Sequence, residues 1–341
     1  MEERPAPIIL RPLEIKHLFD FSIRLYRSCF APMFLSMAIV QLPLSLLTLP
    51  IVLSVTRLMT ELQQASNTGS TPDMAWLYDH ADAAIWIGAG ALGSMIWQLL
   101  VMPLGHLACA RLATLALHGE PCTLLEALAY ARKRYWPTQV VLFTFFLPLL
   151  LLSILVLLPV LALTYAGDGS GAAGAAGLAL LLIFFGSLAT LLLFFRFMFA
   201  VYGVVQSAED PYIEGVFAQG LWYLRRSYEL SATFFWRLFG LYVLLAVALV
   251  IISNGVSQSS QLLVELVRGL IQGNAGAELT NALLAQPDVW TTGISLLISL
   301  LIELVFPALV TSFVVLLYFD LRCRKEGYDL LRMLQQDTLA A

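Results

Sequence analysis

Charged residues are scarce in this 341-residue chain, of which they make up 12%, whereas soluble domains carry about 25%. Hydrophobic residues make up 60%, which is more than a water-soluble core can bury. The composition therefore excludes an ordinary soluble globular protein. The formal net charge of −4 provides no basic surface of the kind that binds a phosphate backbone, so we expect no nucleic-acid partner.

Residues that could act in catalysis or bind a metal are also few. The 4 cysteines have no metal-ligand spacing, and the 4 histidines are isolated from one another. No H-E-x-x-H, Gly-x-Ser-x-Gly or Walker sequence is present. We therefore expect no enzymatic activity, no metal and no cofactor, and we expect the cysteines to be reduced thiols without disulfides. The N-terminus lacks the pattern of a cleaved signal peptide.

Long apolar runs dominate the sequence instead. A helix that crosses the hydrocarbon core of a bilayer, about 30 Å thick, needs about 20 mostly apolar residues. The runs are too long and too uniformly apolar for the alternating strands of a barrel, so they predict an all-α polytopic membrane protein. Six runs are long enough to span: 31–56, 84–110, 139–165, 177–202, 233–256 and 291–319.

The basic residues predict how these spans are oriented, because Lys and Arg concentrate on the cytoplasmic side of membrane proteins. With six spans, every Lys and Arg except Arg57 and Arg268 falls on one side of the membrane. We therefore expect a multi-pass protein of the bacterial inner membrane with both termini in the cytoplasm. Its positive face is expected to contact anionic membrane lipids.

Three amphipathic, basic segments precede the odd-numbered spans, at 13–30, 123–136 and 213–235. Aromatic residues follow each basic cluster, as is typical of helices that lie in the membrane interface. We therefore expect three copies of one unit, an interfacial helix followed by a helical hairpin. The expected organisation is a cytoplasmic N-terminus with an interfacial helix (1–30), a six-helix transmembrane domain (31–319) and a charged cytoplasmic C-terminal helix (320–341).

One stretch matches a nucleotide-binding pattern. Residues 88–93 read Gly-Ala-Gly-Ala-Leu-Gly, which fits G-x-G-x-x-G. That pattern binds a pyrophosphate where it follows a strand and opens a helix, whereas this copy lies inside an expected span. Small residues at this spacing allow two membrane helices to approach closely, so we expect a helix-packing surface here.

Glu303 is the one acidic residue deep in an expected span. A charge at that depth costs about 2.5–3.5 kcal/mol on insertion scales, so it faces a partner or a water-filled cavity. Two interpretations are open. Glu303 is either a proton, cation or lipid-headgroup site, with Arg196 as a conceivable partner, or a protonated or hydrogen-bonded glutamate that holds helices together.

The C-terminal sequence 316–330, LLYFDLRCRKEGYDL, resembles the ending of a bacterial membrane family named after the "glycerophosphoryl diester phosphodiesterase membrane domain". The sequences GEP at 119–121 and LRRSYEL at 224–230 also resemble that family's pattern. The resemblance covers nearly the whole chain and implies a six-span architecture. It implies no activity, because the family is named after proteins that also carry a soluble phosphodiesterase barrel, for which this chain has no stretch of roughly 250 mostly soluble residues.

Opposite charges four residues apart continue the sixth span as a helix, in the pairs 320/324, 322/326 and 325/329. These charges form either a cytoplasmic docking surface, near the basic residues 132–134 or 225–226, or a solvated helix end. The candidate docking surface consists of Asp320, Arg322, Arg324, Glu326, Asp329, Arg225 and Arg226.

Two functions compete on this evidence. The first is a non-catalytic scaffold or partner subunit of a membrane complex, bound to another protein or to further copies of this chain. The second is a transporter or lipid-handling protein with a polar site around Glu303, which the repeat and the prolines paired within spans favour. A polar cavity between the spans would separate the two.

Overall fold

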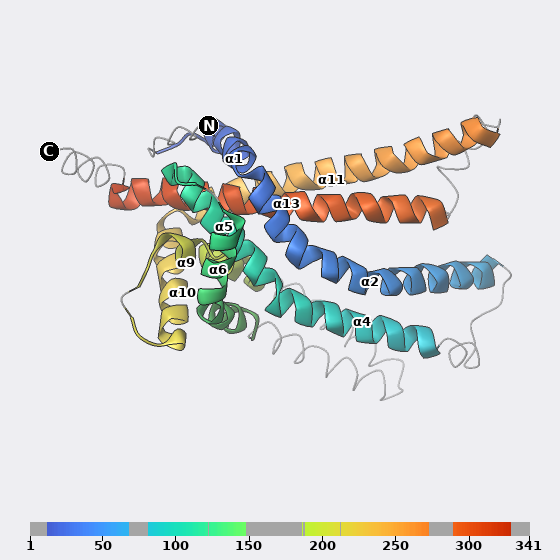
Figure 1. Cartoon of the computed structure of the whole chain (residues 1–341), viewed down its shortest axis with the longest axis horizontal. Helices are drawn as coiled ribbons and strands as arrows, with labels where there is room; N and C mark the ends of the chain where they lie inside the picture. The colour runs from blue at the N-terminus through green and yellow to red at the C-terminus, as the bar shows by residue number, and fades with distance from the viewer. Residues whose placement is uncertain are drawn as a thin grey trace, which may run out of the picture. The chain divides into compact units, whose positions relative to one another are not determined.

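The computed structural model describes residues 12–67, 81–121, 123–147, 186, 188–211, 213–272 and 289–328. Within these residues the secondary structure is helical, and none of them lies in a strand (Figure 1). This confirms the expected all-α polytopic membrane protein. Among the described residues, five helices are long and apolar enough to cross a membrane: Phe30–Val52, Ile85–His118, Leu188–Ala208, Phe235–Val256 and Leu297–Glu326.

The expected span at 139–165 is described in part. Tyr135–Leu147 forms an apolar helix, and residues 148–165 lie outside the described part of the chain. The described helices therefore support a multi-pass protein, while the number of six spans stays a prediction.

Three helix pairs are each joined at a single residue that is not helical. The pairs are α1 (Ile15–Ser28) with α2 (Phe30–Asn67), α6 (Leu124–Lys133) with Tyr135–Leu147, and α10 (Val216–Thr233) with α11 (Phe235–Gln272). The joining residues Cys29, Arg134 and Phe234 have ψ values of 31°, 7° and 27°, far from the roughly −42° of an α-helix. The chain therefore turns at the junction in each pair, which agrees with the predicted order of a short helix followed by a longer apolar one; the full unit of interfacial helix and hairpin stays a prediction.

The expectation of reduced thiols is wrong at the first of these junctions. Cys29 is disulfide-bonded. Cys109 and Cys323 are free thiols and are buried. Sequence spacing does not reveal which cysteines the fold brings close together, and here it failed to indicate the bond.

The remaining labelled helices are α4 (Ala81–Leu100), α5 (Met102–His118), α9 (Val204–Ala208) and α13 (Val289–Glu326). By their internal packing, the residues divide into two compact units. Unit 1 consists of Met1–Phe30, His106–Leu244 and Leu309–Ala341, and unit 2 of Ala31–Gly105 and Leu245–Ala308. Several long helices contribute residues to both units.

The core of unit 1 surrounds the second half of α13, where residues 311–321 are all buried. Helix α10 contributes small residues to this core. A Cβ atom at Gly220 would lie 2.6 Å from Val140, so only glycine permits the observed approach. Tyr223, Leu224 and Leu230 of α10 are buried as well, whereas Val216, Phe217 and Leu221 are exposed. Helix α10 therefore packs one face against the protein and leaves apolar side chains exposed on its surface, while its position in the membrane interface stays a prediction.

Unit 2 contains the contact between α2 and α4. A Cβ atom at Gly90 would overlap the side chain of Ile51, and one at Gly93 would lie 3.3 Å from Leu47. The indole nitrogen of Trp97 donates a 2.9 Å hydrogen bond to the carbonyl oxygen of Val40. The glycine pattern at 88–93 is therefore a helix-packing surface, as expected. Apart from this contact α4 is open, because none of its residues from 85 to 100 is buried.

Candidate functional site

Glu303 in unit 2 forms a polar pair with Gln41. The side-chain nitrogen of Gln41, on α2, donates a 2.7 Å hydrogen bond to a carboxylate oxygen of Glu303, on α13. Gln41 is buried, whereas Glu303 is exposed on the surface of the chain. The side-chain oxygen of Gln41 is buried without a hydrogen-bond partner. The pair therefore combines an exposed carboxylate with a buried acceptor that has no hydrogen-bond partner among the described residues.

Such an arrangement is costly in an apolar environment. A buried polar atom without a partner costs about 1–3 kcal/mol, and a charged group in hydrocarbon costs more. Glu303 lies inside the apolar helix segment Leu297–Glu326. Its hydrogen bond to Gln41 satisfies one carboxylate oxygen and leaves the remaining acceptor capacity to molecules outside the described chain. This is the arrangement expected of a site that accepts hydrogen bonds from a ligand.

Sequence reasoning found Glu303 but missed Gln41. Gln41 is the one carboxamide side chain in the expected span 31–56, and that signal was available. Arg196, the conceivable partner of Glu303, belongs to unit 1, where its guanidinium lies over the rings of Phe235 and Tyr228. The structure therefore gives Glu303 and Arg196 separate partners, each within its own unit.

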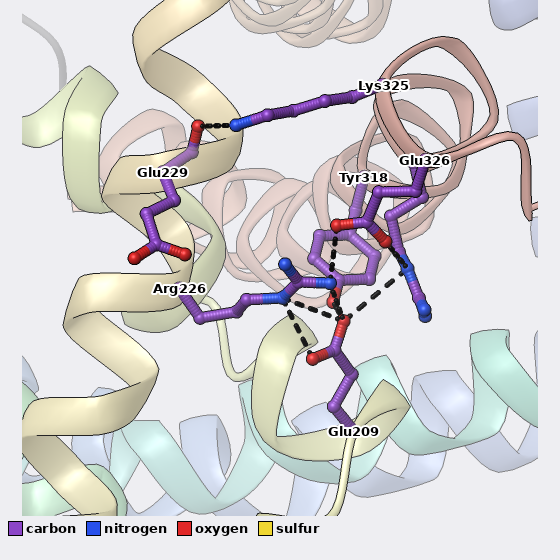
Figure 2. A network of polar contacts seen from close by, with 7 residues as sticks. Glu209, Arg226, Glu229, Tyr318, Lys325 and Glu326 are labelled. Carbon is purple, nitrogen blue, oxygen red and sulfur yellow. Dashed lines mark hydrogen bonds and ion pairs between the residues drawn. The ribbon is translucent and has the colours of Figure 1, made fainter.

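Glu209 is the centre of a charged cluster in unit 1. It follows α9, and its carboxylate accepts two hydrogen bonds from Nε of Arg226, at 3.1 and 2.9 Å, and one from Nη2 at 2.9 Å. Figure 2 shows this carboxylate between Arg226 of α10 and the hydroxyl of Tyr318 of α13, which also donates to it. Arg322 and Glu326 complete the cluster. Arg226 lies 2.6 Å from Glu326, and Arg322 lies 3.1 Å from Glu326 and 3.4 Å from Glu209.

These groups satisfy one another inside the unit. Burial alone would lower the pKa of Arg226, but the hydrogen bonds and negative charge of Glu209 outweigh it and raise that pKa above its usual value. The guanidinium is therefore charged at any physiological pH. Bidentate contacts between arginine and carboxylate are the strongest of the charge-assisted hydrogen bonds, and they hold α9, α10 and α13 together here.

A second cluster surrounds Asp320, whose side chain is 0% exposed. Its carboxylate accepts a 2.7 Å hydrogen bond from the backbone N–H of Leu13 and 3.1 Å bonds from Arg237 and Arg324. The same two arginines donate to the carbonyl oxygen of Leu13, at 2.9 and 2.8 Å. Asp320 therefore ties the chain just before α1 to α11 and α13.

The candidate docking surface is thus divided by the fold. Asp320, Arg322, Arg324, Glu326 and Arg226 belong to the two internal clusters, and the expected pairs 320/324 and 322/326 are present. Arg225 is different, because its side chain is 80% exposed and pairs with Glu229. Asp329 lies outside the described residues. A docking role stays a prediction, and Arg225 is the most accessible candidate member that the structure describes.

A third polar cluster was not found from the sequence. Arg134, at the junction after α6, donates a 3.0 Å hydrogen bond to the hydroxyl of Tyr223 and forms a close ion pair with Asp210. Burial raises the pKa of Tyr223 to about 12, against the opposing effect of Arg134. Asp210, like Glu209, falls in a connecting segment, where no helical periodicity indicates its partner.

The described residues contain no group of three His, Cys, Asp or Glu side chains that could hold a metal ion. The arginine clusters are internal ion pairs that tie helices together. The pair of Gln41 and Glu303 is therefore the best candidate functional site in the part of the chain that is described. Comparisons with models of protein families, with curated proteins and with solved structures found no match for this chain.

Proposed function

We propose that this chain is a lipid-handling protein of the bacterial inner membrane, which binds an amphiphile through Gln41 and Glu303. The observation that carries the proposal is the exposed carboxylate of Glu303 within an apolar helix, where Gln41 is its donor among the described residues. Ionisable groups at such positions mark ligand or ion sites in membrane proteins.

The accessible atoms of the pair indicate the chemistry of the ligand. The carboxylate of Glu303 is exposed and accepts hydrogen bonds, whereas the side-chain oxygen of Gln41 is buried and out of a ligand's reach. A headgroup rich in donors, such as an ammonium or polyhydroxyl group, would satisfy this carboxylate. A headgroup that carries only phosphate oxygens would instead be repelled by the carboxylate.

Unit 2 also presents exposed apolar side chains that suit acyl chains. Leu297 and Leu301 are exposed on the same helix as Glu303, with exposed fractions of 61% and 52%. Helix α4 adds Ile85, Trp86, Leu92 and Ile96, all exposed. Unit 2 therefore combines one polar pair with a large apolar surface, which is the combination that an amphiphile requires.

The uncovered surface of α4 also favours a second function, that of a scaffold or partner subunit. A transmembrane helix of another protein, or of a second copy of this chain, would cover the same apolar residues and would place a donor against Glu303. The two functions predict different molecules in contact with the same position.

A photo-crosslinking amino acid at Leu300, which is half-exposed and lies one helical turn before Glu303 on the same face, would identify that molecule. The full chain would be expressed with this residue, illuminated in intact membranes, and purified for mass spectrometry. We expect an adduct with the mass of one lipid. We expect Glu303→Gln to reduce its yield several-fold, and we expect Glu214→Gln, at an exposed position outside the candidate spans, to leave it unchanged.

A protein adduct would refute lipid handling and support the scaffold. A lipid adduct of equal yield in wild type and Glu303→Gln would mean that lipid contacts the helix without recognition by the pair. Thermal unfolding of each variant controls for a loss of structure.

The proposal includes six spans with both termini in the cytoplasm, supported by the distribution of Lys and Arg. The disulfide at Cys29 is unusual for a segment on the reducing side of a membrane, so this orientation needs a direct test. A protease added to sealed spheroplasts should leave tags at both termini intact and should remove them once the cells are opened. Cleavage in intact spheroplasts would reverse the orientation.

A further inference from the structure

Arg196 lies near the middle of the apolar helix Leu188–Ala208, within unit 1, and contacts Phe235, the first residue of the candidate span Phe235–Val256. Its carbonyl oxygen accepts hydrogen bonds of 3.1 and 3.0 Å from the hydroxyls of Ser227 and Ser231 on α10. Its guanidinium carbon lies 4.8 Å from the ring centroid of Phe235 and 5.3 Å from that of Tyr228. The backbone is therefore fixed against α10, and the guanidinium contacts two aromatic rings.

The guanidinium of Arg196 has no carboxylate partner among the described residues, unlike the arginines of the internal clusters. Its Nη1 atom is buried without a hydrogen-bond partner. The Nε and Nη2 atoms have no protein partner in the described part of the chain and are open to the surroundings. A guanidinium that is partly buried without an anion is unfavourable, so an anion from outside the described residues is expected to pair with it.

The exposed residues next to Arg196 indicate where that anion comes from. Tyr228 is 48% exposed, and Trp236, which follows Phe235, is 78% exposed. Exposed tyrosine and tryptophan at the end of an apolar helix are typical of the depth at which lipid headgroups lie. The planar fork of arginine matches the oxygens of a phosphate, which are abundant at this depth.

We propose that Arg196, in contact with the rings of Tyr228 and Phe235, binds the phosphate of an anionic membrane lipid. The open edge of the guanidinium donates to the phosphate oxygens, and the two rings fix the orientation of the guanidinium. A lipid is favoured over free phosphate because Arg196 belongs to an apolar helix that an inorganic anion would have to leave water to reach. This site accepts an anion, whereas the pair in unit 2 accepts donors, so the two proposals stand or fall separately.

The test uses the full chain in detergent with short-chain phosphatidylglycerol, and native mass spectrometry to count the lipids retained. Phosphatidylcholine of equal chain length is the competing lipid, and inorganic phosphate is the competing free anion. We expect wild type to retain phosphatidylglycerol in preference to phosphatidylcholine. We expect Arg196→Gln to weaken this binding by about tenfold or more, the effect of losing one charge-assisted hydrogen bond.

The matched control is Arg225→Gln, which removes an equal charge from an exposed arginine that is already paired with Glu229. It should retain phosphatidylglycerol as wild type does. Arg196→Lys, which keeps the charge but loses the planar fork, should have intermediate affinity. If Arg196→Gln does not fold, the comparison of wild type with Arg196→Lys decides.

Three results would overturn the proposal. They are equal retention by wild type and Arg196→Gln, no preference of wild type for phosphatidylglycerol over phosphatidylcholine, and displacement of the lipid by inorganic phosphate at equal concentration. The last would identify a free-anion site. A protein that co-purifies through Arg196, with no lipid effect, would show that the anion is a partner's carboxylate.

Discussion

Replacement of Asp320 by asparagine should loosen the start of α1 and destabilise unit 1. The carboxylate is completely buried and pairs with Arg237 and Arg324, whose side chains are 26% and 27% exposed. The isosteric amide keeps an acceptor for the backbone N–H of Leu13 but removes the negative charge between two arginines. Those arginines would then repel each other across a buried neutral group.

The size of the effect follows from the burial of the partners. Removal of one partner of a buried ion pair costs about 3–5 kcal/mol. Water reaches about a quarter of each arginine side chain and recovers part of that loss, so the lower end of the range, about 3 kcal/mol, is expected. That corresponds to a factor of roughly 100 in the unfolding equilibrium.

Two measurements on the full chain in nanodiscs would check this prediction. The midpoint of denaturant unfolding should fall, and amide hydrogen exchange should accelerate at Leu13 and in the first turn of α1, because the bond from Leu13 weakens. Asp20→Asn is the control, since Asp20 is an exposed carboxylate of the same helix. A variant within about 0.5 kcal/mol of wild type, with unchanged exchange at Leu13, would refute the assignment of Asp320 as the link between α1, α11 and α13.

Two further predictions concern packing and pH. Gly90→Ala should destabilise the contact between α2 and α4 by about 1–3 kcal/mol, because the added Cβ overlaps a neighbouring side chain. Gly88→Ala is the control and should not destabilise it, because no atom lies within 4 Å of the added Cβ. Equal unfolding midpoints of the two variants would contradict the helix-packing role. Burial, aided by the nearby thiol of Cys109, raises the pKa of Tyr26 from 10.0 to about 12. The folded state therefore favours the protonated hydroxyl. The stability that this provides is present below pH 10 and is lost as the pH rises to 12. Tyr26→Phe removes a buried hydroxyl without a hydrogen-bond partner, so the free energy of unfolding at pH 7 should be unchanged or higher. Between pH 10 and 12 this free energy should decline less steeply than in wild type. An equally steep decline would show that other groups cause the pH dependence.

Features that depend on neighbours in the sequence could be predicted. The apolar runs predicted the long helices, and the basic amphipathic segments predicted α1, α6 and α10. The pairs 320/324 and 322/326 were predicted because residues four apart lie on one face of a helix. In each case the distance along the chain fixes the distance in space, so one sequence suffices.

Features that depend on remote parts of the chain could not be predicted. Gln41 and Glu303 are separated by 262 positions, and Leu13 and Asp320 by 307. Glu209 lies in a connecting segment, and its partner Tyr318 is 109 positions away. Local periodicity places each of these residues on a helix or in a loop, but it does not determine which helices pack together.

The adjacent residues Arg225 and Arg226 show why a dense charge cluster alone does not define a docking surface. Successive residues of an α-helix point about 100° apart, since there are 3.6 residues per turn. Arg225 consequently points outward and is 80% exposed, while Arg226 points inward to Glu209 and Glu326 and is 20% exposed. Two neighbouring arginines of α10 therefore have different roles, one at the surface and one inside the unit. Loss of Arg226 should act on folding, and loss of Arg225 should act on whatever contacts the surface, so a docking partner is best sought with changes at Arg225 rather than in the C-terminal clusters.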